Sequence, residues 1–148
     1  MEVVQWVLQK YKKKGKLFDI VCLAYATSPL LSKKEFCDAC KKFEKTNRRF
    51  PLISVSIFNP SIDEAMSYKG NYITPVNSKK FYKDSKKHKK YYFETGSFIF
   101  YSTKNFYNKN FKFKLNKKFL PFELPREKAV DINTYEDFNF VKKLIKIK

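Results

Sequence analysis

Acidic and amide side chains gather near the C-terminus, where Asp131, Asn133, Glu136 and Asp137 lie within seven residues. They come after a predicted strand and lead into a predicted helix, which is the end of an α/β sheet where such folds bind ligands. A carboxylate there can hold Mg²⁺ against a phosphate group. The competing interpretation is helix capping, with Thr134 as the N-cap residue and the two later acidic groups complementing the helix dipole. Spacing alone favours capping.

Two other groups of side chains have types that can do chemistry, a Cys37-x-x-Cys40 pair and the single histidine, His88. A structural zinc site needs four ligands, usually two such pairs, and a redox pair is expected at the start of a helix. This pair lies inside a predicted helix, so we expect it to pack as small hydrophobic side chains. His88 is flanked by lysines, and we expect a solvated loop residue.

Composition narrows the class of protein. The 148 residues are enough for one domain with its own core, and 32 basic against 14 acidic residues give a net charge of +18. Such a charge is typical of proteins that bind nucleic acid. Only three of the basic residues are arginine, however, the residue that hydrogen-bonds to base edges. We therefore favour a genomic bias toward AT-rich codons and consider nucleic acid an unlikely partner.

The sequence contains no apolar run long enough to cross a membrane. It also has no recognisable signal peptide, and its three cysteines do not form a disulfide framework. We therefore expect a cytoplasmic protein without a membrane partner.

The elements that must position these side chains alternate along the chain. Apolar spacing predicts helices over 2–14, after the Ser32-x-x-Glu35 capping box and from Thr134. It predicts strands over 18–25, 51–58 and 119–124, the first of them buried. Between the last two strands, turn signals predict a hairpin turn at 68–72, and an aromatic extended stretch follows over 91–101. Such alternation predicts an α/β fold with a three-layer, mostly parallel sheet.

Four segments stand out in order along the chain: Phe18 to Pro29, Ser54 to Pro60, Tyr92 to Phe98 and Pro121 to Phe138. Together they resemble the acylneuraminate and, more closely, the pseudaminic acid cytidylyltransferase family. The first is similar to the family's central strand and its Thr-Ser-Pro turn, the third to a segment beside the sugar site, and the fourth to the C-terminal signature. Tyr25 stands where acylneuraminate enzymes usually have glutamine, which favours the pseudaminic branch.

The resemblance implies transfer of CMP from CTP to a nonulosonic acid, a nine-carbon keto-sugar acid such as pseudaminic or N-acylneuraminic acid. Pyrophosphate is released, Mg²⁺ is the cofactor, and the fold is of the nucleotide-diphospho-sugar transferase type. No catalytic residue is assigned with it. The implied sugar-binding residues are Tyr25, Thr27, Ser28, Glu94 and Gly96, and the implied metal ligands are Asp131 and Asn133.

The sequence departs from the family pattern in several places, including the loop before Tyr92, where Asp84 to Lys87 replace the family's Arg-x-Gln-Asp segment. The Gly/Arg/Lys-rich loop that grips the CTP phosphates has no counterpart, so we expect residues 1–148 to be a single domain, the C-terminal portion of an N-terminally truncated cytidylyltransferase domain. Asn133 replaces an aspartate, which should weaken metal binding, and Phe93 replaces a histidine of the sugar pocket.

These departures leave several hypotheses open. We expect the chain to be almost inactive alone, with a complementing N-terminal chain and a second copy in a homodimer as candidate partners. The alternatives to an enzyme are a non-catalytic remnant and a basic nucleic-acid-binding module.

Overall fold

The computed structural model describes residues 1–104, 106–107 and 118–146. Within these ranges four strands form one sheet in the order β1-β5-β2-β6. β5 pairs antiparallel with both β1 and β2, while β2 and β6 pair parallel. Three strands therefore run one way and β5 runs against them. The strands are β1 (Ile20–Ala24), β2 (Leu52–Ile57), β5 (Tyr92–Ser102) and β6 (Leu120–Glu123).

The predicted α/β class is confirmed, and the sheet is mixed. The strands at 18–25, 51–58 and 119–124 were expected to be parallel, and they do share one direction. The aromatic stretch at 91–101 inserts between two of them as β5. The local residue pattern predicts extended backbone in each of these segments. Which strand pairs with which depends on contacts between residues that are distant in the sequence.

Helix α2 (Lys33–Lys45) covers one face of the sheet. It begins with the predicted capping box, in which the Ser32 backbone N–H donates to Glu35 Oε2 at 2.7 Å. Its Phe43 is fully buried with Phe98 and other residues of the sheet. This cluster is the main apolar core.

Helix α1 (Glu2–Lys13) packs on the other face. Its Val4 and Leu8 contact Tyr101 of β5, whose neighbour Phe100 belongs to the opposite cluster. Successive residues of a strand point to opposite faces, so β5 serves both clusters at once. No helix in the described ranges has the length and apolar character needed to span a membrane.

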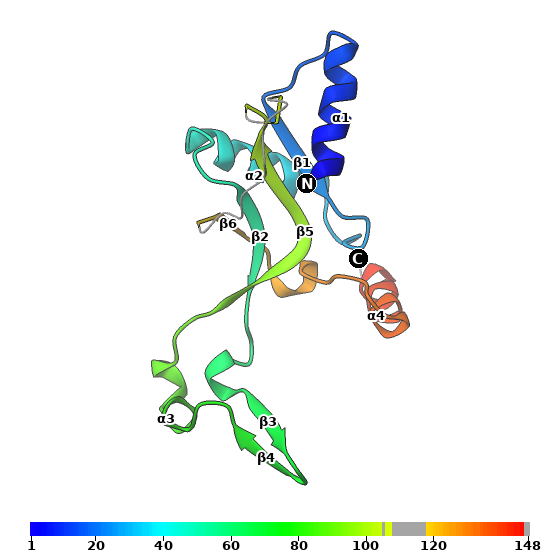
Figure 1. Cartoon of the computed structure of the whole chain (residues 1–148). Coiled ribbons are helices and arrows are strands. Elements are labelled where there is room, and N and C mark those ends of the chain that lie inside the picture. Colours follow the sequence, from blue (N-terminus) through cyan, green and yellow to red (C-terminus); the bar gives the residue numbers. More distant parts are fainter. Residues whose placement is uncertain (105, 108–117, 147–148) are drawn as a thin grey trace.

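Residues 58–91 leave the sheet as an extension that we call the arm. Figure 1 shows its hairpin at one end of the molecule and α1 toward the other. The predicted turn at 68–72 is confirmed, because Lys69 pairs with Tyr72 and Gly70 between them has a φ of +62°. The arm contains η1 (Ile62–Glu64), β3 (Met66–Lys69), β4 (Tyr72–Pro75), α3 (Ser78–Phe81) and η2 (Ser85–Lys87).

After β6 the chain passes through η3 (Arg126–Lys128) and a loop into α4 (Tyr135–Lys146). Lys128 of η3 forms an ion pair with Glu35 at the start of α2. This contact joins η3, which precedes the predicted metal ligands, to the start of α2.

Candidate functional site

An irregularity in the pairing of β2 and β5, which we call the bulge, shapes the candidate site. Ile53 pairs with Ile99 and Val55 pairs with Glu94, so Ser54 alone faces residues 95–98 of β5. Bulges bend a strand and re-aim its side chains, often beside active sites. Gly96 lies in the bulged segment at a φ of +62°, a region that glycine enters without the steric penalty of a side chain.

Buried hydroxyl groups fill the gap that the bulge leaves in the ladder. The Ser54 hydroxyl accepts from the Phe98 backbone N–H and donates to the Phe98 carbonyl, both at 3.1 Å. Thr95 Oγ1 lies 2.8 Å from Ser54 Oγ and 2.9 Å from Ser97 Oγ. These hydroxyls stand in for ladder hydrogen bonds, since buried backbone polar groups need partners.

This hydroxyl network is a positioning device that the sequence interpretation missed. A signal for it exists, because Ser54 and Ser56 alternate in one strand and Thr95 and Ser97 in the other. Small polar residues at a period of two in otherwise apolar strands indicate one polar row inside the sheet.

A cavity of about 480 Å³ opens beside the bulge. Its size lies within the range of small-molecule sites. It is bordered by the turn after β1, the beginning of β5 and the loop before α4, so the structure brings three distant segments together. Six of the seven predicted site residues line it, namely Tyr25, Thr27, Glu94, Gly96, Asp131 and Asn133. Their roles as sugar and metal contacts stay predictions.

The seventh predicted residue, Ser28, does not line the cavity and lies behind the residues that do. It is buried, and its hydroxyl donates to the Gly96 carbonyl at 3.3 Å. Backbone hydrogen bonds join the same segments, from Tyr25 N to the Ser97 carbonyl at 3.0 Å and from Ile132 N to the Thr27 carbonyl at 2.9 Å. The three segments are thereby held at fixed positions around the cavity.

The Asp131 carboxylate sits against Gly96. A Cβ atom at position 96 would lie 3.1 Å from Asp131 Oδ2, so the absence of a side chain makes room for the carboxylate. Asn133 Nδ2 donates to the same oxygen at 2.9 Å. Asp131 Oδ1 is buried and has no hydrogen-bond partner among the described residues. A buried oxygen without a partner is costly, which favours any cation that reaches it.

The acidic residues of the segment 131–137 have two different roles. Asp137 Oδ2 accepts from the backbone N–H groups of Asn133 at 3.0 Å and Thr134 at 2.8 Å, and Thr134 Oγ1 accepts from Asp137 N at 3.2 Å. Hydrogen bonds from Asn133 and then Thr134 lower the pKa of Asp137. The capping interpretation is therefore confirmed for Thr134 and Asp137, while Asp131 faces the cavity.

Packing as a small hydrophobic side chain is confirmed for Cys40 of the Cys37/Cys40 pair and is wrong for Cys37. Cys22 and Cys40 lie against the main apolar core, and Cys37 is exposed. Burial raises the pKa of Cys22 to about 11, and burial and then Glu44 raise the pKa of Cys40. Both thiols stay protonated near neutral pH, a form that is a poor nucleophile. Across the described ranges no group of three histidine, cysteine or acidic side chains is arranged to hold a metal.

The expectation of a solvated histidine is wrong. The His88 side chain is only 5 % exposed, and its Nδ1 lies 3.4 Å from Glu64 Oε1 inside the arm. The flanking Lys87 and Lys89 remain exposed. Polarity of the neighbours indicates a surface segment, but it does not indicate which residue of a turn points inward.

No family model matches the chain. It is 32% identical over 146 residues to a pseudaminic acid cytidylyltransferase of Campylobacter jejuni subsp. jejuni serotype O:2, and 32% identical over 145 residues to the protein of that name from serotype O:23/36. The alignments cover 98% and 97% of this chain, and 62% and 61% of the relatives.

The chain thus spans about three fifths of the length of the curated relatives it matches. The resemblance that the motifs indicated is confirmed, and it extends over nearly all of the chain.

Proposed function

We propose that this chain, a relative of the pseudaminic acid cytidylyltransferases, carries the sugar-acid and metal side of an enzyme that transfers CMP from CTP to a nonulosonic acid. The observation that carries the proposal is the cavity beside the bulge, where residues from three distant segments that match the family motif lie together. The names of the relatives support the reaction class. Helices on opposite faces of the sheet support a three-layer fold of the nucleotide-diphospho-sugar transferase type.

The cavity wall offers suitable partners for a polyhydroxylated sugar. The Glu94 carboxylate accepts hydrogen bonds from sugar hydroxyls, and the Thr27 hydroxyl both donates and accepts. The half-exposed ring of Tyr25 provides an apolar surface with a polar end. In the proposed reaction these groups hold the sugar while its anomeric hydroxyl attacks the α-phosphate of CTP and pyrophosphate leaves.

The residues present fit Mg²⁺. Asp131 offers a buried oxygen without a partner, and Asn133 orients the carboxylate through its amide nitrogen while its own carbonyl oxygen accepts no hydrogen bond from the described residues. Mg²⁺ in nucleotide enzymes is usually held by one or two carboxylates together with substrate phosphates and water. When bound, it offsets charge that develops on the phosphates. Because Asn133 adds no charge, we expect weaker binding than at a pair of aspartates.

A metal titration tests this part of the proposal. We expect Asp131→Asn to abolish Mg²⁺ binding and Asn133→Asp to tighten it, as measured by calorimetric titration with magnesium chloride. Asp38→Asn is the matched control, since Asp38 is exposed on α2, away from the cavity. Unchanged Mg²⁺ binding in the Asp131 variant would contradict the assignment.

The activity test is CTP-dependent pyrophosphate release with pseudaminic or N-acetylneuraminic acid. We expect little turnover by the chain alone and turnover when a second polypeptide supplies a Gly/Arg/Lys-rich loop that grips CTP. Asp131→Asn should abolish that turnover and Asp38→Asn should preserve it. Robust turnover by the chain alone would show that no complementing chain is needed. A mixture that neither turns over nor binds a sugar acid would overturn the proposed function.

A further inference from the structure

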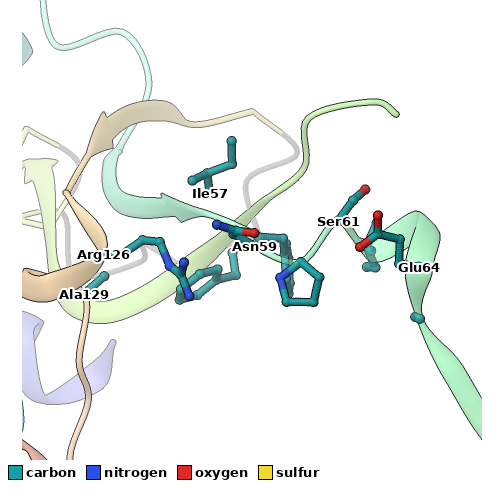
Figure 2. A pocket seen from close by; sticks show the side chains of 11 residues that line it. Ile57, Asn59, Ser61, Glu64, Arg126 and Ala129 are labelled. Atoms are coloured by element: carbon teal, nitrogen blue, oxygen red, sulfur yellow. The ribbon is translucent and has the colours of Figure 1, made fainter. Parts of the chain in front are cut away.

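A second cavity, also of about 480 Å³, adjoins the first and shares Phe93 and Ala129 with it. It is bordered by the exit of β2, by η1 and by η3. Figure 2 shows Arg126 extending toward Asn59, with Ser61 and Glu64 on the far side of the cavity. We refer to this space as the Arg126 cavity.

The Arg126 guanidinium faces this cavity without an ion pair or a hydrogen bond to any described residue. The other two arginines are engaged: Arg48 lies 3.8 Å from carboxylates of Asp19 and Glu44, and Arg49 lies over the Phe50 ring at 5.3 Å. A guanidinium presents a planar fork of donors that matches the two oxygens of a carboxylate or phosphate group. A fork that faces a cavity unpaired offers its donors to an anion.

The rest of the cavity leaves the Arg126 end positively charged. Among its lining residues the carboxylate of Glu64 is the one acidic group, and it lies 3.4 Å from His88. The Phe58 and Phe93 rings, with centroids 5.1 Å apart, form an apolar wall. Arg126 itself is exposed, so an ionic contact there is screened by water and salt, and the apolar wall borders only one side of the bound group.

We infer that the Arg126 cavity is an anion subsite that receives the carboxylate of the sugar-acid substrate, with the Asn59 amide as a second donor. This inference rests on the proposed function. In a keto-sugar acid the carboxylate is attached to the carbon that bears the reacting hydroxyl, so its site must adjoin the cavity that holds Asp131. The shared wall of Phe93 and Ala129 meets this requirement. A phosphate oxygen of the nucleotide is the other anion with matching chemistry.

The test compares a carboxylate with its uncharged ester and with a phosphate. The ¹⁵N-labelled full chain is titrated with N-acetylneuraminic acid, with its methyl ester and with inorganic pyrophosphate, and dissociation constants are read from chemical shifts. We expect the acid to bind about tenfold more tightly than the ester. Arg126→Gln should remove that preference by weakening only the acid, and Arg126→Lys should retain part of it. Arg49→Gln is the matched control, since this arginine is remote from both cavities, and it should change nothing.

Three outcomes would overturn the inference. They are equal losses for acid and ester in Arg126→Gln, unchanged acid binding in that variant, and no acid binding by the unmodified chain. A loss confined to pyrophosphate would assign the subsite to the nucleotide instead. Acid binding that depends on Arg126, with no CMP transfer even when the complementing polypeptide is present, would contradict the proposed function alone. Transfer that is indifferent to Arg126 would contradict the inference alone.

Discussion

The sheet and the arm are built by different forces. The sheet and helix α2 together bury large apolar side chains such as Phe98 and Phe43, beside the row of buried hydroxyls around Ser54. In the arm Tyr68 and Tyr72 are 84% and 77% exposed, and Asp63 and the His88 side chain are among its buried groups. Burial of a large apolar side chain contributes about 1.5–3 kcal/mol, whereas an exposed ion pair contributes at most about 1 kcal/mol. The sheet should therefore be stable by itself, and the arm should respond to salt and pH.

Lys80 shows how the arm is held. Its Nζ lies 3.3 Å from Asp63 Oδ1 and donates to the Tyr91 hydroxyl at 2.9 Å. The hydrogen bonds to Tyr91 and then Asp63 raise the pKa of Lys80. A raised lysine pKa means that this contribution is fully present below the ordinary value of 10.5 and is lost as the pH rises above it.

The largest effect should come from the centre of the sheet. Phe98→Ala removes a fully buried ring that contacts Phe36, Phe100 and Phe122, and we expect a loss of about 3–5 kcal/mol in the free energy of unfolding. Ile73→Ala in the arm, where the side chain is 54% exposed, should cost below about 1 kcal/mol. Urea denaturation measures both, and similar losses would contradict the comparison.

The next effect concerns acid stability of the sheet. Burial alone would raise the pKa of Glu35, but hydrogen bonds from Lys128 and Ser32 lower it from 4.5 to about 2. The stabilisation is therefore complete above pH 4.5 and is lost as the pH falls toward 2. We expect Glu35→Gln to lose about 1–3 kcal/mol at neutral pH and to converge with the unmodified chain in strong acid.

Urea unfolding across the acid range measures this effect. Glu44→Gln, which alters a carboxylate that is half exposed beside Arg48, is the control and should cost below about 1 kcal/mol. A constant difference between Glu35→Gln and the unmodified chain at all pH values would exclude the ion pair as its cause.

A pair of glycines sharpens the comparison further. Gly96 in the sheet and Gly70 in the arm both have a φ of +62°, but an added Cβ atom would meet other atoms within 4 Å at Gly96 and none at Gly70. Alanine at either site should cost about 1–2 kcal/mol for the left-handed backbone. Gly96→Ala should also displace the Asp131 carboxylate and weaken Mg²⁺ binding, whereas Gly70→Ala should leave Mg²⁺ binding unchanged. Calorimetric titration distinguishes them, and equal Mg²⁺ affinities would refute the contact.

The smallest effect should be local. Lys80→Met removes the contacts to Asp63 and Tyr91, and we expect faster amide hydrogen exchange over residues 62–87 with unchanged exchange over β5. The reason is that few apolar contacts remain to hold the arm closed. Lys79→Met, on the same helix and without a described ion pair, is the control. Faster exchange in β5 as well would mean that arm and sheet unfold together.

Local chemistry accounts for what the sequence predicted correctly. The Ser32–Glu35 capping box, the turn at Gly70 and the apolar runs of β1, β2 and β6 each depend on residues close together in the chain. The family motif identified six of the residues that line the first cavity.

Long-range arrangement accounts for what the sequence did not predict. The position of β5, the bulge opposite Ser54, the inward turn of His88 and the unpaired state of Arg126 depend on contacts between distant segments. No local period encodes such contacts.

The order of strands also governs how the chain assembles during synthesis. Because β5 lies between β1 and β2, these two earlier strands form no hydrogen bonds with each other. The arm must leave the ribosome before β5 can join them, and closing such long loops is slow because their entropy must be lost first. Throughout that interval the edges and apolar faces of β1 and β2 stay open to other chains. The nascent chain therefore passes through a stage in which these strand edges are exposed, and that stage ends when β5 enters the sheet.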